Sequence, residues 1–323
     1  MSDTPYQGLS PETMLDALDR AGFRTDGRLM PLNSYENRVY EAGIEDDAPV
    51  VAKFYRPDRW TDAAILEEHA FIGELCDADL PCVAPVRRDG VSLFEFAGFR
   101  YAVFPRQAGR PPNVEDREVL RVLGHALGRM HAVGATMPFV HRRRLTVGDF
   151  ATDSADFLLG SGLIEPELTN AYRAVTAQLI ERVAPVLATA RTHIRIHGDC
   201  HLGNLLWRYD APNFVDFDDT MTGPPVQDLW MLLSGDRDDR SRQLADLVEA
   251  YEVFHVFDAQ ETRLIEPLRA LRMIHHAAWI GRRWQDPAFP VAFPDFGGTR
   301  YWSEHILTLK EQLAVLDEPP LTL

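Results

Sequence analysis

The hydrophobic positions in the first third of the chain alternate with polar ones or run in short blocks, which is typical of β-strands. Strands are expected over residues 37–42 and 50–55, and again over 91–96 and 99–104. Each pair of strands flanks a turn-rich segment. The pattern therefore predicts two antiparallel hairpins.

A helix is expected between the two hairpins. Thr61 can cap its N-terminus, and apolar residues follow at helical spacing, namely Ile65, Leu66, Phe71, Ile72 and Leu75. Glu67 and Glu68 lie on the same helix, and only one of two consecutive residues can face inward.

After Pro105 the spacing of apolar residues becomes mainly helical. One helix is expected through Leu120 to Met130, ending at Gly134, and others over residues 166–190, 240–257 and 261–284. An island of strand interrupts them, at residues 193–197, 204–208 and 213–217.

The order of these elements predicts an α+β protein with two lobes. A β-rich lobe is expected over residues 1–106, and a mainly helical lobe carrying one small hairpin over 107–323. At 323 residues the chain is long enough for two lobes, each with its own core.

The composition narrows the classes of function. The net charge of −16 disfavours nucleic acid and anionic lipid as partners. The three cysteines are an odd count that favours a reducing compartment, and neither a signal sequence nor a membrane span is visible. We therefore expect a monomeric protein of the cytoplasm.

Only two of the 33 basic residues are lysines, Lys53 and Lys310. Lys53 lies inside the apolar run of residues 50–55, on an expected strand. A strand lysine can simply extend its charged end into water. In a chain that otherwise uses arginine, however, a compact ammonium there suggests a specific partner.

The strand island contains residues whose spacing suggests phosphoryl transfer. Asn204 follows Asp199 by five residues, and Asp216 ends the next short strand. An acceptor hydroxyl needs a carboxylate to take its proton, while Mg²⁺ on the phosphates needs other hard oxygen ligands. Asp199 fits the base, and Asn204 and Asp216 fit the metal ligands.

The first lobe can supply the remaining part of such a site. Lys53 could hold the α- and β-phosphates of ATP, oriented by an ion pair with Glu68 on the following helix. Glu67 is the neighbouring alternative, and the sequence does not decide between the two.

The chain resembles the kinase-like fold of aminoglycoside and choline kinases, and within it the bacterial stress response kinase A proteins, also described as RdoA-like Ser/Thr kinases. The resemblance is carried by residues 31–40, 53–57, 65–69, the 197–204 loop and 225–233, and it extends to 282–284 and 318–320. It implies a bilobal protein-kinase-like fold and ATP-dependent phosphorylation of Ser or Thr on proteins in stress responses.

The resemblance also implies roles for individual residues. Asp199 corresponds to the proton acceptor, Asn204 and Asp216 to magnesium ligands, and Ser34 to a nucleotide contact. The phosphate loop at residues 33–38 departs from that of ordinary protein kinases because it contains no glycine. Its contacts are then expected from Ser34 or from backbone amides.

Several other motifs are not expected to be catalytic. The Asp-Phe-Gly at 295–297 lies far along the chain from Asp199, in a loop rich in Pro and Gly. The histidines His125, His131 and His141 and the basic run 142–144 are interpreted as helix or surface features. Asp228 is expected to be a buried partner for backbone amides of the 197–204 loop.

Three alternatives remain open at the sequence level. A small-molecule kinase acting on an amine or alcohol would use the same nucleotide residues. A zinc hydrolase could use His197, Asp199 and His201, which share a face of an extended strand. A non-catalytic binding module would leave Lys53 and Asn204 without a function.

Overall fold

The computed structural model describes residues 5–323, which form two compact units, each assembled from separate parts of the chain. Within the described residues, the first unit comprises 5–113, 139–142 and 201–220, and the second comprises 114–138, 143–200 and 221–323. The predicted boundary between the two lobes at residue 106 remains a prediction.

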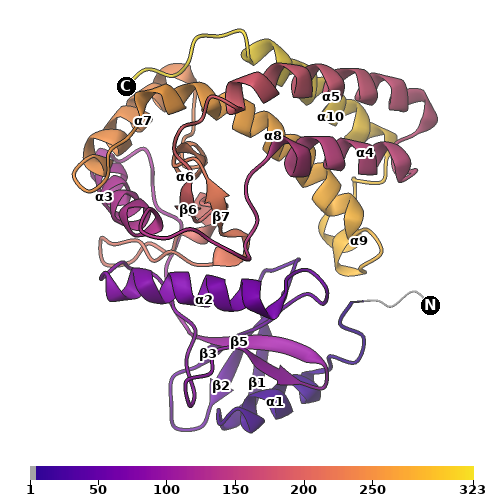
Figure 1. The fold of residues 1–323 in the computed structure, drawn as a ribbon. Helices are drawn as coiled ribbons and strands as arrows, with labels where there is room; N and C mark the ends of the chain where they lie inside the picture. Colours follow the sequence, from indigo (N-terminus) through magenta and orange to yellow (C-terminus); the bar gives the residue numbers. More distant parts are fainter. Residues whose placement is uncertain (1–4) are drawn as a thin grey trace. The chain divides into compact units, whose positions relative to one another are not determined.

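An antiparallel five-stranded sheet organises the first unit, in the order β1-β2-β3-β5-β4 (Figure 1). Its strands are β1 (Thr25–Pro31), β2 (Arg38–Ile44), β3 (Val50–Phe54), β4 (Phe94–Phe96) and β5 (Phe99–Pro105). The two predicted hairpins, β2–β3 and β4–β5, are confirmed. The sequence pattern had not predicted β1, most of which is exposed.

A different helix lies on each face of this sheet. Helix α1 (Pro11–Arg20) packs its buried Met14 and Leu18 into a core with Tyr101 and Val103. Helix α2 (Asp62–Asp77) contributes Ile65 to a core with Ala102. The alternation along β5 thus divides the sheet into an α1 face and an α2 face.

The N-terminus of α2 forms where the sequence predicted it. The Thr61 side chain accepts a hydrogen bond from the Ala64 N–H at 3.2 Å, which satisfies one of the free amides of the first turn. Ile65, Phe71, Ile72 and Leu75 are buried as expected, but Leu66 is 47% exposed.

The second unit is mainly helical. Its elements are α3 (Arg117–Gly134), α4 (Asp153–Gly160), α5 (Pro166–Leu187), α6 (Val226–Trp230), α7 (Arg237–Tyr251), α8 (Ile265–Arg282), α9 (Ala288–Ala292) and α10 (Thr299–Val315), with a short π-helix at Gly148–Thr152 and a 3₁₀ turn at Ala259–Leu264. Its main core joins side chains of α4, α5, α8 and α10.

Close packing of α3 against α7 depends on glycine. A methyl group at Gly124 or Gly128 would overlap the carbonyl oxygens of Leu247 and Tyr251. The two helices therefore approach to backbone contact along this line, which fixes the position of α3 and of its buried residue His131.

The strand island differs from the prediction. Strand β6 (Ile194–Ile196) forms, but it pairs with the unpredicted β7 (Met221–Gly223). Residues 204–208 and 213–217 are joined only by isolated bridges such as Leu205 with Phe214, and 3₁₀ turns occupy Leu202–Asn204 and Phe217–Asp219. The predicted strands over 204–208 and 213–217 are wrong. Within the second of them Asp216 has a left-handed backbone, which does not fit a regular strand.

Candidate active site

Lys53 lies on the α2 face of the sheet, in the first unit. Its neighbours Ala52 and Phe54 are buried in the core with α1, so alternation directs the lysine to the other side. The Nζ atom lies 3.1 Å from an oxygen of Asp216, 3.1 Å from one of Asp218 and 3.7 Å from Oε1 of Glu68. Lys53 is thus a buried cation among three carboxylates.

These carboxylates keep the lysine charged. Burial by itself lowers the pKa of the Lys53 ammonium, but Asp218, Glu68 and Asp216 outweigh it and raise that pKa well above its ordinary value. A buried ammonium paired in this way presents a fixed positive point charge, which suits the recognition of phosphate oxygens.

The structure distinguishes Glu68 from Glu67. Glu68 is fully buried and forms the expected ion pair with Lys53, and burial raises the pKa of its carboxyl group. The Glu67 carboxylate instead accepts hydrogen bonds from the backbone N–H groups of residues 140, 141 and 142, at 2.6 to 2.8 Å. Glu67 therefore fixes a segment of chain, and Glu68 orients the lysine.

Asn204 and Asp216 lie on adjacent segments of the chain. The Val215 N–H donates to the Asn204 carbonyl at 3.1 Å, so Asp216 follows the residue paired with Asn204. Asp216 has a left-handed backbone (φ 59°), and its side chain is 52% exposed. An amide oxygen and an accessible carboxylate are ligands that suit a hard cation such as Mg²⁺.

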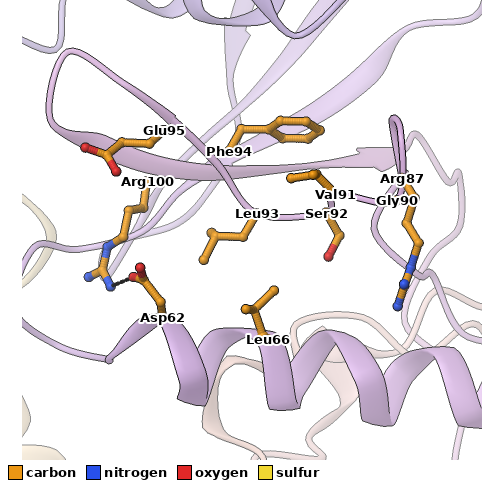
Figure 2. A pocket seen from close by; sticks show the side chains of 10 residues that line it. All are labelled: Asp62, Leu66, Arg87, Gly90, Val91, Ser92, Leu93, Phe94, Glu95 and Arg100. Carbon is orange, nitrogen blue, oxygen red and sulfur yellow. Dashed lines mark hydrogen bonds and ion pairs between the residues drawn. The ribbon is translucent and has the colours of Figure 1, made fainter.

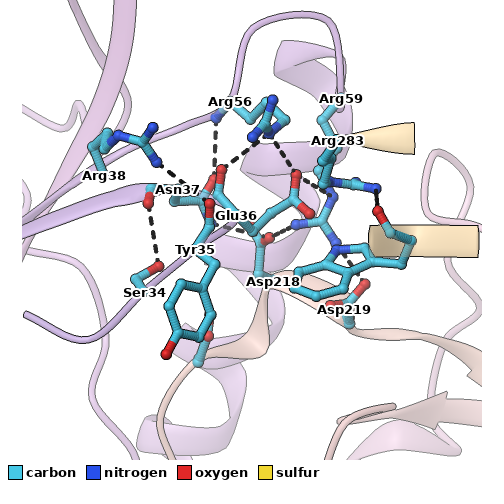
Figure 3. A network of polar contacts seen from close by, with 12 residues as sticks. Ser34, Tyr35, Glu36, Asn37, Arg38, Arg56, Arg59, Asp218, Asp219 and Arg283 are labelled. Carbon is cyan, nitrogen blue, oxygen red and sulfur yellow. Dashed lines mark hydrogen bonds and ion pairs between the residues drawn. The ribbon is translucent and has the colours of Figure 1, made fainter. Parts of the chain in front are cut away.

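Asp218 is a second carboxylate beside Lys53 and Asp216, and it was not predicted as a site residue. It is 3% exposed, binds Arg59 through a close ion pair and accepts a hydrogen bond from the Asn37 amide at 3.1 Å (Figure 3). Burial by itself raises the pKa of the Asp218 carboxyl, but Arg59 and Lys53 outweigh it and lower the pKa to about 2.

Arg59 connects the same carboxylate to the phosphate loop. Its guanidinium also lies 2.7 Å from Asp219 and 3.8 Å from the Glu36 carboxylate (Figure 3). Asn37, next to Glu36, accepts a hydrogen bond from the Arg56 N–H at 3.1 Å. Side-chain contacts thus hold a loop without glycine at residues 33–38, in place of the tight backbone turn that glycine permits.

Ser34 lies in this loop and is half-buried, with its hydroxyl donating to the Asn37 carbonyl at 3.3 Å. This bond fixes the loop conformation, and the role of Ser34 as a nucleotide contact remains a prediction.

Arg142 corrects the interpretation of the basic run 142–144 as a surface feature. It is 6% exposed, lies 3.7 Å from Glu68, and donates to the Asp218 and Thr220 carbonyls. Its guanidinium lies over the Trp60 ring, 3.9 Å from the centroid. Arg142 therefore links the helix that carries Glu68 to the segment that follows Asp216.

Asp199, the predicted base, belongs to the second unit and is a quarter exposed. Its Oδ1 atom forms an ion pair of 2.6 Å with Nη1 of Arg272, on α8. Arg272 was not predicted as a partner of Asp199, because one arginine in a helical pattern gives no sign of a partner 73 residues away.

Asp228 confirms its predicted structural role. Its buried carboxylate accepts the backbone N–H groups of His197 at 2.7 Å and Gly198 at 2.8 Å. It also lies 3.1 Å from Nε2 of His131, whose Nδ1 lies 2.9 Å from the Tyr251 hydroxyl. The loop before Asp199 is thus fixed by hydrogen bonds to one charged group.

One hollow of the first unit lies beside α2. It has a volume of about 510 Å³ between α2 and residues 87–100, and its lining includes Leu66, Ser92 and the ion pair of Asp62 with Arg100 (Figure 2). None of the predicted site residues lines it. This hollow is therefore not the predicted active site.

No group of three or more His, Cys, Asp and Glu side chains within residues 5–323 is arranged to hold a metal ion. The zinc alternative through His197, Asp199 and His201 therefore has no structural support. Helices of the length and apolar composition needed to cross a bilayer are likewise absent from the described part of the chain.

Residues 28–265 match the model of a family described as the phosphotransferase enzyme family. The chain belongs to this family. Among similar proteins, stress response kinase A of Escherichia coli K12 is 46% identical over 98% of this chain and 97% of its own length. A serine/threonine protein kinase RdoA of Salmonella typhimurium is 43% identical over the same shares. This phosphotransferase is a kinase, as the resemblance implied.

Solved structures show the same fold at low sequence identity. An amicoumacin kinase has a TM-score of 0.71 and 18% identity, covering 94% of this chain and 93% of its own. A spectinomycin phosphotransferase has a TM-score of 0.65 and 14% identity, covering 93% of this chain and 98% of its own. The α+β, kinase-like fold predicted for this phosphotransferase is confirmed.

Proposed function

We propose that this phosphotransferase is a Ser/Thr protein kinase that transfers the γ-phosphoryl group of ATP to a hydroxyl group. The observation that carries the proposal is the buried Lys53 ammonium, paired with Glu68 and lying 3.1 Å from the accessible Asp216. A fixed cation beside an exposed carboxylate suits a nucleotide whose phosphates carry a divalent metal.

Lys53 binds phosphate oxygens in this proposal, and Glu68 and Arg142 hold the helix and the adjoining chain so that the ammonium stays in place. Asn204 and Asp216 would hold Mg²⁺, which when bound offsets the negative charge of the phosphates. Ser34, in the loop braced by Arg59 and Asn37, would contact the nucleotide.

Asp199 acts on the acceptor rather than on the nucleotide. The acceptor oxygen bonds to the γ-phosphorus as the bond to ADP breaks, and the hydroxyl proton passes to the Asp199 carboxylate. Arg272 orients that carboxylate through its 2.6 Å ion pair. Asp228 fixes the backbone just before it.

The protein acceptor is supported by relatives at 43–46% identity whose names describe them as stress response or Ser/Thr protein kinases. The neighbours named for small-molecule acceptors are 14–18% identical and therefore indicate the fold alone. A small-molecule acceptor remains the alternative that the experiment distinguishes.

The proposal also covers the cellular compartment, the oligomeric state and the lobe boundary of the enzyme. We infer a cytoplasmic protein because its three cysteines are unpaired. We also infer a monomer, which light scattering would test, and functional lobes that divide near residue 106.

The decisive experiment incubates the enzyme with γ-labelled ATP, Mg²⁺ and extract from cells that lack it, then separates protein-bound from small-molecule label. We expect label on Ser or Thr of proteins. Label only on small molecules would favour the alternative acceptor, and label on neither would overturn the kinase proposal.

The variant Asp199→Asn tests the proposed role of Asp199 as the base. We expect it to lower kcat by roughly 10² to 10⁴-fold with little change in ATP affinity, because a positioned base contributes about that much. Asp210→Asn makes the same chemical change in the exposed turn between residues 208 and 211, and it should leave kcat unaffected. More than about a tenth of the wild-type kcat in Asp199→Asn would contradict the assignment.

A further inference from the structure

Two thiols of the first unit, those of Cys76 and Cys82, lie next to each other. Cys76 is the penultimate residue of α2, and Cys82 follows in the loop after it. Their Sγ atoms lie 3.0 Å apart without a covalent bond, and both residues are partly exposed. The third cysteine, Cys200, is fully buried.

The backbone between the two thiols is held by hydrogen bonds. The N–H groups of Asp79 and Leu80 donate to the carbonyls of Cys76 and Leu75, each at 2.9 Å. The Cys82 N–H donates to the Leu80 carbonyl, also at 2.9 Å. The thiols therefore face each other because the loop is fixed, which lowers the entropic cost of joining them.

We propose that Cys76 and Cys82 are a reversible redox site that a hydroperoxide oxidises to an intramolecular disulfide. A disulfide has a sulfur–sulfur length of about 2.05 Å, so the two atoms need to approach by only about 1 Å. Such a bond is transient in a reducing compartment, as expected for a regulatory rather than a structural disulfide.

The chemistry requires two steps. The Cys76 thiolate attacks one oxygen of hydrogen peroxide, the O–O bond breaks, and a sulfenic acid forms with release of water after protonation. The Cys82 sulfur then attacks the Cys76 sulfur, the S–O bond breaks, and the Cys82 proton leaves with the hydroxyl group as a second water. Two thiols and one peroxide thus give one disulfide and two waters.

Cys76 is the first nucleophile because the surroundings of Cys82 disfavour a thiolate. Burial raises the pKa of the Cys82 thiol, and its sulfur lies 3.7 Å from the Ile72 carbonyl oxygen. Since the thiolate is the reactive form, oxidation should become faster as the pH rises above neutral.

The two cysteines join segments that support the nucleotide residues. Cys76 ends the helix that carries Glu68. Cys82 bridges to Phe214, two residues before Asp216, and the neighbouring Pro81 carbonyl accepts the Phe214 N–H at 2.9 Å. Oxidation of the two thiols would therefore affect the part of the fold that supports Lys53 and its carboxylates.

The test uses the full chain, reduced and then treated with hydrogen peroxide. After unfolding, thiol titration should fall from three groups per chain to one, and the intact mass should fall by two hydrogens. A thiol reductant should restore both values. Peptide mapping of the wild-type protein should recover Cys76 linked to Cys82 within one chain.

Cys76→Ser and Cys82→Ser should each abolish the mass loss, whereas Cys200→Ala should preserve it. The peptide map needs no variant, so it decides the question even if a variant folds poorly. An unchanged thiol count, a gain of oxygen without a disulfide, or a link only between chains would overturn the proposal.

Discussion

Lys53 shows how one side chain can be identified before its surroundings are known. It is one of two lysines in a chain that otherwise uses arginine, and it interrupts an apolar strand. The structure supplies what the sequence could not, namely that Asp216, Asp218 and Glu68 all lie within 3.7 Å of its ammonium. Asp218 in particular was not predicted, because nothing in the run of residues 215–219 tells which carboxylates turn inward.

We predict that Lys53→Arg is nearly as damaging as Lys53→Met. A guanidinium fork cannot occupy the buried space of a point charge between Glu68 and Asp216, so each variant should lower kcat/KM by roughly 10² to 10³-fold. The matched control is Lys310→Met on the exposed side of α10, which should retain full activity. Full activity of Lys53→Arg would mean that charge alone is required at this position.

The ion pairs of Asp218 predict a pH dependence of stability. Its pKa of about 2 lies below the ordinary value of 3.8, so its contribution to the free energy of unfolding is present above about pH 4. That contribution is lost as the pH falls through 3.8 toward 2. The shift corresponds to about 2 kcal/mol at neutral pH.

Asp218→Asn should therefore lower the free energy of unfolding at pH 7 by about 2 kcal/mol or more, since Arg59 and Lys53 each lose a partner. The difference from the wild type should shrink between pH 4 and pH 2. Urea denaturation at several pH values measures it, with Asp89→Asn in an exposed turn as the control. A difference that stays constant with pH would contradict the ion-pair account.

At the level of elements, some regular strands and helices were predicted from the sequence, but β1, β7, α1 and α10 were not. The β2–β3 and β4–β5 hairpins and helix α2 were predicted because alternation and capping are local properties. The segments around Asn204 and Asp216 were predicted as strands, but single bridges and 3₁₀ turns hold them. Turn backbone at Asp216, rather than a regular strand, leaves its carboxylate accessible.

We predict that substitutions of the two proposed metal ligands in this irregular segment change the magnesium dependence of activity to different degrees. Asn204→Ala and Asp216→Ala should both raise the Mg²⁺ concentration needed for half-maximal activity. The effect should be larger for Asp216, because it supplies a full negative charge and Asn204 a neutral oxygen. Water can partly replace the amide at high Mg²⁺.

Magnesium titrations of both variants measure these effects. Asn213→Ala is the control, because it removes the same type of side chain from a residue that is no proposed metal ligand and whose backbone pairs with Leu206. An unchanged magnesium dependence in Asp216→Ala would remove the metal-ligand role.

At the scale of the whole molecule, segments that are far apart in the sequence belong to the same compact unit. Residues 139–142 and 201–220 belong to the first unit although residues of the second unit surround them in sequence. Local patterns cannot reveal such a grouping, because it depends on contacts between distant residues such as Glu67 with the backbone at 140–142. Arg142 was misread for this reason, and its burial followed from its place in the first unit.

The buried Asp228 carboxylate has a consequence for isotope exchange. His197 and Gly198 lie outside any helix or strand, yet both amide protons are bound to one fully buried carboxylate. Their exchange with deuterated water requires opening of the surrounding structure, so it should be as slow as that of α3. Asp228→Asn should accelerate it, and fast exchange in the wild type would contradict the hydrogen bonding described. Deuterium uptake at these two amides would then report, without any substrate present, whether the chain leading into Asp199 is held in place.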